Sequence, residues 1–189
     1  MPNFKNEKGE EKYFSKEQVG LKRKIVIDGI KWEKIPTPPP PSRYKRLESA
    51  LEEARSVIDP ISEFIDELNG YENPEEPFSE ELKKKTSEKL QEMVFSIDIS
   101  EIECLRDEIE NWKSGMEGTN LENSSKYSDL EECYDSLENG ISELEDLDFE
   151  IEIGEKETPN ELAERMQEFI YDLENAIGDL EGVNFPGMF

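Results

Sequence analysis

The chain has no histidine and only two cysteines, Cys104 and Cys133, among its 189 residues. It therefore lacks the commonest general base and metal ligand of proteins. Two cysteines are too few for a disulfide scaffold, and each falls at or next to an apolar helical position, so we expect reduced thiols. No glycine-rich phosphate loop, Cys/His metal cluster or EF-hand loop is present either. These absences favour a non-catalytic protein without a cofactor or metal.

Long hydrophobic runs are also missing. Hydrophobic residues make up 34% of the chain and the mean hydropathy is -0.82. No apolar run approaches the roughly 20 residues that span a bilayer, and the polar N-terminus lacks a signal-peptide core. We expect a soluble protein of the cytoplasm, or of the host cytoplasm if it is viral, without membrane contacts. Its core must be thin, as in helical hairpins that use few apolar residues per turn.

Basic residues are scarce and are concentrated near the N-terminus. Residues 1–46 contain 12 Lys/Arg and 6 Asp/Glu, whereas the remainder contains 10 basic and 42 acidic residues. This asymmetry predicts a basic N-terminal arm (1–35), a proline-rich linker (36–42) and an acidic helical domain (43–189). The field of the acidic domain repels DNA, RNA and anionic membranes and attracts cationic protein surfaces. Only the arm is left as a direct nucleic-acid binder.

The arm contains one clear β-hairpin signal. Residues 24–35 are two β-prone runs around Asp28-Gly29, which predicts a type I′ turn. Residues 1–20 are polar and aperiodic, so we expect a flexible leader. Because an isolated hairpin is marginal in water, we expect a third strand at 149–153, where apolar and acidic residues alternate. The proline run 36–41 predicts a stiff polyproline II spacer; the alternative is a ligand for an aromatic-lined groove.

The rest of the chain predicts a mainly α protein, an antiparallel bundle of about five helices. Apolar residues recur at spacings of three and four over 43–68, 79–95, 125–147 and 158–180. A further helix begins at Ser100, with Glu103 completing a capping box, and Asp59-Pro60 predicts a kink or a new start in the first helix. The apolar tail 183–189 is expected to fold back on the bundle. The lysines at 83–85 and 89 are expected to be solvated or paired with nearby glutamates.

One helical phrase occurs twice. Residues 136–149 and 172–185 share Leu, Glu, Asn, Ile, Leu, Glu and Phe in register, with an offset of 36 residues. Both copies place a narrow apolar seam under a broad carboxylate face. Like charges three and four residues apart destabilise a helix by a few tenths of a kcal/mol each, and solubility needs only a modest net charge. We therefore expect a partner-binding surface formed by Glu138, Glu143, Glu145, Asp146, Glu174, Asp179 and Glu181.

In its charge and size the chain resembles the acidic DNA-mimic proteins that phages use against restriction, CRISPR and other host nucleic-acid-binding proteins. The phrase Leu-Glu-Asn-x-Ile-x-x-Leu-Glu and the tail Phe185-Pro186-Gly187 look like uncharacterised acidic helical proteins of phages and prophages. These resemblances imply an anti-defence inhibitor that sequesters a basic, nucleic-acid-binding host protein. The opposite reading is an acidic solvated helical domain with an unrelated protein partner.

Two further functions stay open at this point. The chain is alternatively a structural or assembly adaptor that oligomerises through its helical seams and tail. As a minor alternative, it superficially resembles the all-α nucleoside triphosphate pyrophosphatases, whose helical carboxylates hold Mg²⁺. The ligands implied by that resemblance are Glu131 or Glu132, Asp135, Glu161 and Glu164.

Overall fold

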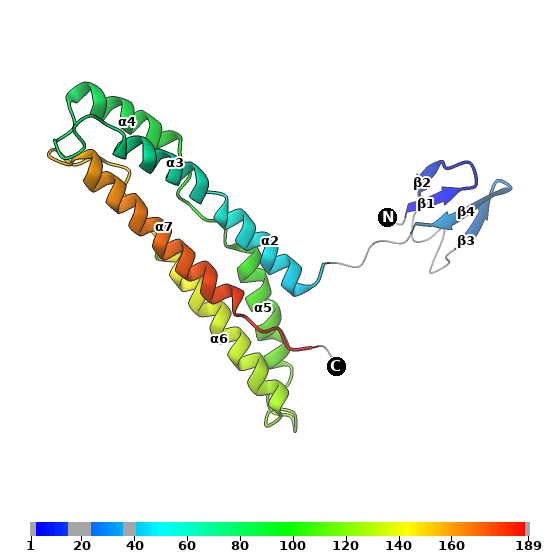
Figure 1. Cartoon of the computed structure of the whole chain (residues 1–189). Coiled ribbons are helices and arrows are strands. Elements are labelled where there is room, and N and C mark those ends of the chain that lie inside the picture. The colour runs from blue at the N-terminus through cyan, green and yellow to red at the C-terminus, as the bar shows by residue number, and fades with distance from the viewer. Residues whose placement is uncertain (1–2, 15–23, 36–40, 188–189) are drawn as a thin grey trace. The chain divides into compact units, whose positions relative to one another are not determined.

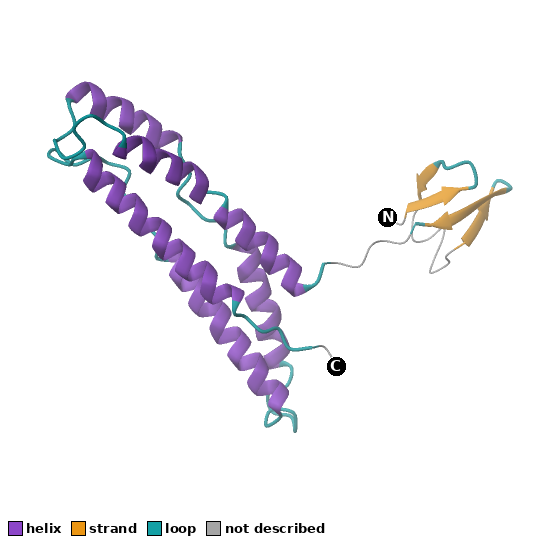
Figure 2. Ribbon diagram, in the orientation of Figure 1, coloured by secondary structure: helices purple, strands orange, loops and turns teal. Residues whose placement is uncertain are grey.

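The computed structural model describes residues 3–14, 24–35 and 41–187. The chain divides into two compact units, residues 1–41 and residues 42–189, which we call the sheet unit and the helical unit (Figures 1 and 2). The predicted proline spacer at 36–42 lies almost entirely outside the described residues. Among the described residues, no helix combines the length and apolar composition that a bilayer-spanning segment needs.

The sheet unit is a four-stranded antiparallel sheet with strand order β2-β1-β4-β3. Its strands are β1 (Asn3–Asn6), β2 (Glu11–Tyr13), β3 (Lys24–Ile27) and β4 (Ile30–Lys34). The predicted hairpin is confirmed as β3–β4. Asp28 and Gly29 both have positive φ, 53° and 73°, which is the backbone conformation of a type I′ turn.

Two predictions about this sheet are wrong. Part of the expected flexible leader at 1–20 forms β1 and β2, and the expected third strand at 149–153 is not a strand. The partners of the hairpin are local, because Phe4 and Phe14 bury Trp32 in a small aromatic core. Segment 149–153 stays in the helical unit, where Phe149 stacks on Phe95. There Ile153 is buried, and Arg165 donates hydrogen bonds to the carbonyl oxygens of residues 150 and 152.

The helical unit contains all the helices of the described residues. They are α2 (Arg43–Arg55), α3 (Ile58–Asn69), α4 (Glu80–Glu92), α5 (Ser100–Ser114), α6 (Ser125–Glu145) and α7 (Pro159–Glu181). The first predicted helix is broken in two, as its Asp-Pro pair suggested. The break slightly precedes this pair, because Val57 is the N-cap of α3. Pro60 then lies in the first turn, where a missing N–H breaks no helical hydrogen bond.

Side-chain caps fix where most of these helices begin. Thr158 and Glu161 form a capping box at the start of α7, and the side chain of Ser79 caps α4. The capping box predicted at Ser100 is wrong, because Ser100 is already the first helical residue and Ile99 is the N-cap. The carboxylate of Asp98 accepts the backbone N–H of Ser100 instead.

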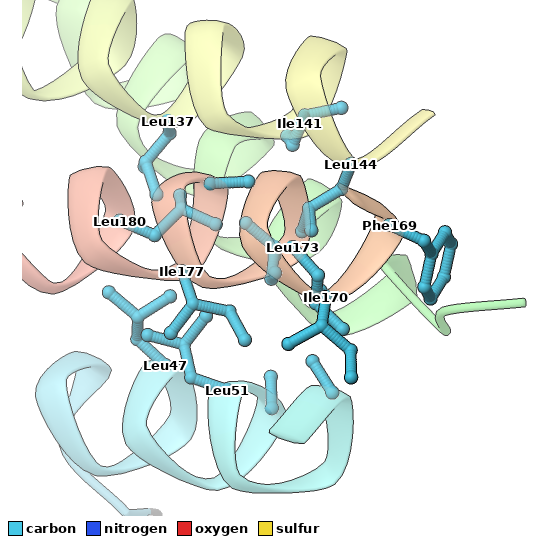
Figure 3. Close-up of a cluster of buried hydrophobic side chains, with 14 of the residues drawn as sticks. Leu47, Leu51, Leu137, Ile141, Leu144, Phe169, Ile170, Leu173, Ile177 and Leu180 are labelled. Carbon is cyan, nitrogen blue, oxygen red and sulfur yellow. The ribbon is translucent and has the colours of Figure 1, made fainter. Parts of the chain in front are cut away.

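The core of the helical unit forms where α6 packs on α5 and α7, and where α2 and α3 pack on α7. Figure 3 shows leucine and isoleucine side chains of α2, α6 and α7 meeting in this core. The tail after α7 folds back as expected, since Val183 and Phe185 are buried. The backbone N–H of Phe185 donates to the Tyr44 hydroxyl over 3.0 Å.

Candidate functional site

The two copies of the repeated phrase pack against each other on α6 and α7. They are in close contact at Gly140, where an added Cβ would lie 2.4 Å from the side chain of Leu180. In Figure 3, Leu137 of α6 lies at the same end of the contact as Leu180, and Leu144 lies toward Leu173. In the repeat, Leu137 is equivalent to Leu173 and Leu144 is equivalent to Leu180. The 36-residue offset therefore converts each of these two contacts into the other. The duplicated segments therefore pair as two similar halves of one antiparallel contact.

This register brings the seven predicted carboxylates to the same level of the helix pair. The two helices run antiparallel side by side (Figure 1), so residues after Gly140 on α6 are level with residues before Leu180 on α7. Asp146 is thus level with Glu174, and Glu138 with Glu181. From residue 138 to residue 146 the helix axis advances about 12 Å at 1.5 Å per residue. All seven carboxylates lie within this stretch.

All seven side chains are exposed, but two of them already have partners. Glu138 pairs with Arg106 of α5 at 3.1 Å, and Glu181 pairs with Arg55 of α2 at 2.6 Å. The other five have no ion-pair partner among the described residues. These five, which we call the open carboxylates, are Glu143, Glu145, Asp146, Glu174 and Asp179.

Four of the open carboxylates lie where a negative charge interacts unfavourably with the helix dipole. Glu143, Glu145 and Asp146 are at the C-terminal end of α6, and Asp179 is in the last turn of α7. The C-terminal end of a helix carries partial negative charge, so a nearby carboxylate typically costs about 0.3–1 kcal/mol. Neither last turn contains a basic residue. These four carboxylates therefore lower the stability of the folded state.

Most carboxylates of the helical unit are uncompensated. Residues 42–189 hold 42 acidic and 13 basic residues. Within the described residues, nine of these acids take part in ion pairs: Glu67, Glu81, Glu88, Glu101, Asp107, Glu108, Glu138, Glu157 and Glu181. Lys84 and Lys85 of α4 pair with glutamates one turn away as expected. Lys89 and Lys83 differ from the prediction, because Lys89 pairs with Glu67 of α3 and Lys83 donates to the carbonyl oxygen of Gly154. Few cations remain to neutralise the surface.

An ion-pair cluster joins α2 to α5, and sequence reasoning missed it. Arg46 of α2 bonds both Glu101 and Glu108 of α5, and Arg43 bonds Glu108 at 3.0 Å. Hydrogen bonding to Arg46 holds the pKa of Glu108 below its ordinary value. Trp112 lies beside this cluster, with the Arg43 guanidinium 5.3 Å from its ring. The sequence did contain a signal for these ion pairs. Arg43 and Arg46 are three residues apart on one side of α2, close to its apolar face, where they can reach a neighbouring helix.

The two halves of the suggested Mg²⁺ site do not meet. Glu131, Glu132 and Asp135 lie on the N-terminal half of α6, whereas Glu161 and Glu164 lie in the first turns of α7. In the register set by Gly140 and Leu180, the two groups are separated by roughly 30 Å or more along the helices. Among the described residues, no group of three or more acidic or cysteine side chains has the geometry to hold a metal ion.

No family model, no curated protein and no solved structure matches this chain.

Proposed function

We propose that the protein is a non-catalytic acidic binding protein that sequesters a basic partner, a nucleic-acid-binding protein, by imitating the charge of a nucleic acid. The observation that supports this is the set of open carboxylates on the paired repeats. Charges that destabilise the helices carrying them, with no cation beside them, are unlike the scattered ion pairs of an ordinary solvated surface. Binding to a cationic groove gives these charges the partners they lack.

The position of the open carboxylates suits this function. They lie within a stretch of about 12 Å along the helix pair and have no ion-pair partner among the described residues. A surface of this kind attracts Lys and Arg side chains at long range, so association is fast and weakens with salt.

A capture experiment with two matched variants tests the proposal. The first variant neutralises the open carboxylates (E143Q, E145Q, D146N, E174Q and D179N). The control neutralises five exposed acids of α3 and the following loop that have no ion-pair partner in the described structure (E63Q, D66N, E72Q, E75Q and E76Q). Both variants lose five negative charges, so they differ only in where the charge was removed.

Each protein is immobilised and exposed to extract of the source cells at low salt, and bound proteins are eluted with excess duplex DNA. The proposal predicts that the wild type and the control retain the same DNA-eluted basic protein and that the first variant loses it. Retention by all three proteins, or loss by both variants alike, would reject the α6–α7 surface. Retention that resists both DNA and high salt would favour the adaptor function.

A further inference from the structure

The sheet unit has one covered face and one open face. Side chains alternate between the faces along each strand. Phe4 and Trp32 point to the covered face, where they pack with Phe14. The strand register places Lys5 opposite Glu33, and Glu33 opposite Lys24, across β1, β4 and β3 on the other face. That second face is exposed at each of these positions.

The open face is hollowed. An open hollow of about 960 Å³ lies against β1, β4 and β3, much larger than the hollows of about 250–360 Å³ on the helical unit. Its lining includes every open-face residue of these strands from Lys5 to Ile35, together with the intervening Asn6, Ile25, Ile27, Trp32 and Lys34. The open-face residues that line it are Lys5, Glu7, Lys24, Val26, Lys31, Glu33 and Ile35. We call this hollow the sheet groove.

The sheet unit is small for a structure with so much exposed apolar surface. Its described core has three buried side chains, while Val26 and Tyr13 are 65% and 66% exposed. A sheet normally buries each apolar face against another element, and units of this size rarely hold a large core alone. Val26 lies in the sheet groove itself, so a partner that fills the groove covers it.

The shape of the groove favours a helix as its occupant. A segment lying on the face of a sheet makes no ladder hydrogen bonds with it, so an extended peptide would leave its own backbone unpaired there, whereas a helix satisfies its backbone internally. A helix about 10 Å wide occupies about 420 Å³ per turn of 5.4 Å. The volume of the sheet groove therefore corresponds to about two helical turns.

The charges of the groove select an acidic helix. Lys5, Lys24, Lys31 and Lys34 line it, against Glu7 and Glu33. Lys24 pairs with Glu33 at 3.1 Å, whereas Lys5 and Lys31 have no ion-pair partner among the described residues. Val26 and the lysine stems offer apolar contact between these charges. Nucleic acid fits less well, since Trp32 is buried and no other aromatic side chain lines the groove for base stacking. The two glutamates would also repel phosphates.

We propose that the sheet groove binds an amphipathic acidic helix of a partner protein, with an apolar seam on Val26 and carboxylates on Lys5 and Lys31, beside the Lys24–Glu33 pair. This interaction is separate from the α6–α7 surface, which binds cations. One chain thus presents two recognition surfaces of opposite preference, a groove for an acidic helix and a carboxylate surface for a basic protein.

Three labelled helical peptides of 18 residues, titrated into the full chain, test the groove. They share one stripe of leucines at helical spacing and differ only in the flanking residues, which are glutamate, glutamine or lysine. In fluorescence anisotropy at about 150 mM NaCl, the glutamate peptide should bind at least tenfold more tightly than the glutamine peptide. The lysine peptide, which the acidic surface of the helical unit attracts, is a control whose binding the groove variants should not weaken. A leucine-free poly-glutamate peptide and a single-stranded oligonucleotide serve as competitors and should displace the glutamate peptide poorly.

Variants then locate the binding. K24E/K31E should weaken binding of the glutamate peptide at least tenfold, the milder K24Q/K31Q should give a smaller loss, and V26D should weaken binding with every lysine retained. The control K45E/K156E changes two lysines of the helical unit that have no ion-pair partner in the described structure, and should stay within twofold of the wild type. Equal binding of the glutamate and glutamine peptides, displacement by poly-glutamate or the oligonucleotide, or insensitivity to V26D would each overturn the proposal.

Discussion

Replacing Gly140 with alanine should destabilise the helical unit, although alanine is the better helix former. A Cβ at position 140 would lie 2.4 Å from Cγ and Cδ2 of Leu180, where carbon atoms normally stay about 3.5–4.0 Å apart. Leu180 is fully buried, so its side chain has little room to move. Overpacking of this kind typically costs about 1–3 kcal/mol, against about 0.5–1 kcal/mol gained in helix propensity.

Gly178 supplies the matched control. It also lies within a helix, α7, but an added Cβ would meet no atom within 4 Å. G178A should therefore stabilise the protein by about 0.5–1 kcal/mol. Because the propensity gain is common to both variants, the difference between their unfolding free energies isolates the steric cost of about 1–3 kcal/mol.

Urea unfolding followed by the helical circular dichroism signal measures both values. The same G140A substitution made in a Leu180→Ala background tests whether its effect on stability changes sign. L180A alone should cost about 2–5 kcal/mol, and G140A introduced into it should then stabilise, because the obstructing side chain is gone. If G140A in the wild-type background stabilises as much as G178A, the two helices do not touch at this level. The alignment of the seven carboxylates would then be wrong as well.

Three further predictions follow from the charges and thiols. Raising NaCl from about 20 to 500 mM should raise the melting temperature, because screening relieves repulsion among carboxylates that outnumber the ion pairs; a fall would show that the α2–α5 ion pairs dominate. The pKa of Glu108 is held below its ordinary value, so its stabilising contribution is complete above about pH 4.5 and is lost as the pH falls through the lowered pKa. The difference in unfolding free energy between wild type and E108Q should thus shrink only in acid, and a difference constant down to pH 3 would contradict this. Burial raises the pKa of Cys133 to about 11 while Cys104 is exposed, so a thiol reagent should label one cysteine quickly and C104S should abolish that phase.

The helices were predictable because periodicity and caps act locally. Thr158, Pro159 and Glu161 define the start of α7 within four residues, and the seam of α6 and α7 follows a three-four spacing. The hairpin at Asp28-Gly29 was predictable for the same reason. Strands β1 and β2 could not be predicted, because they have only four and three residues and are stabilised by pairing with other strands.

Segment 149–153 shows how a local pattern is overridden. Its alternation is a strand signal, but in the helical unit Phe149 packs on Phe95 and Phe169 and Ile153 is buried, while Ile151 stays exposed. The exposure of the predicted carboxylates followed from the helical pattern. The pairing of Glu138 with Arg106 and of Glu181 with Arg55 did not, because it joins residues 32 and 126 positions apart. Such pairs depend on tertiary packing.

The most direct test of the α6–α7 surface is competition for the partner that the capture experiment isolates. That partner is bound to labelled duplex DNA, and the mobility of the complex is followed as this protein is added. The account predicts that the wild type and the α3 control release the DNA in proportion to their concentration, less effectively at high salt, and that the variant lacking the open carboxylates does not. A ternary complex with DNA, or equal release by all three proteins, would contradict it.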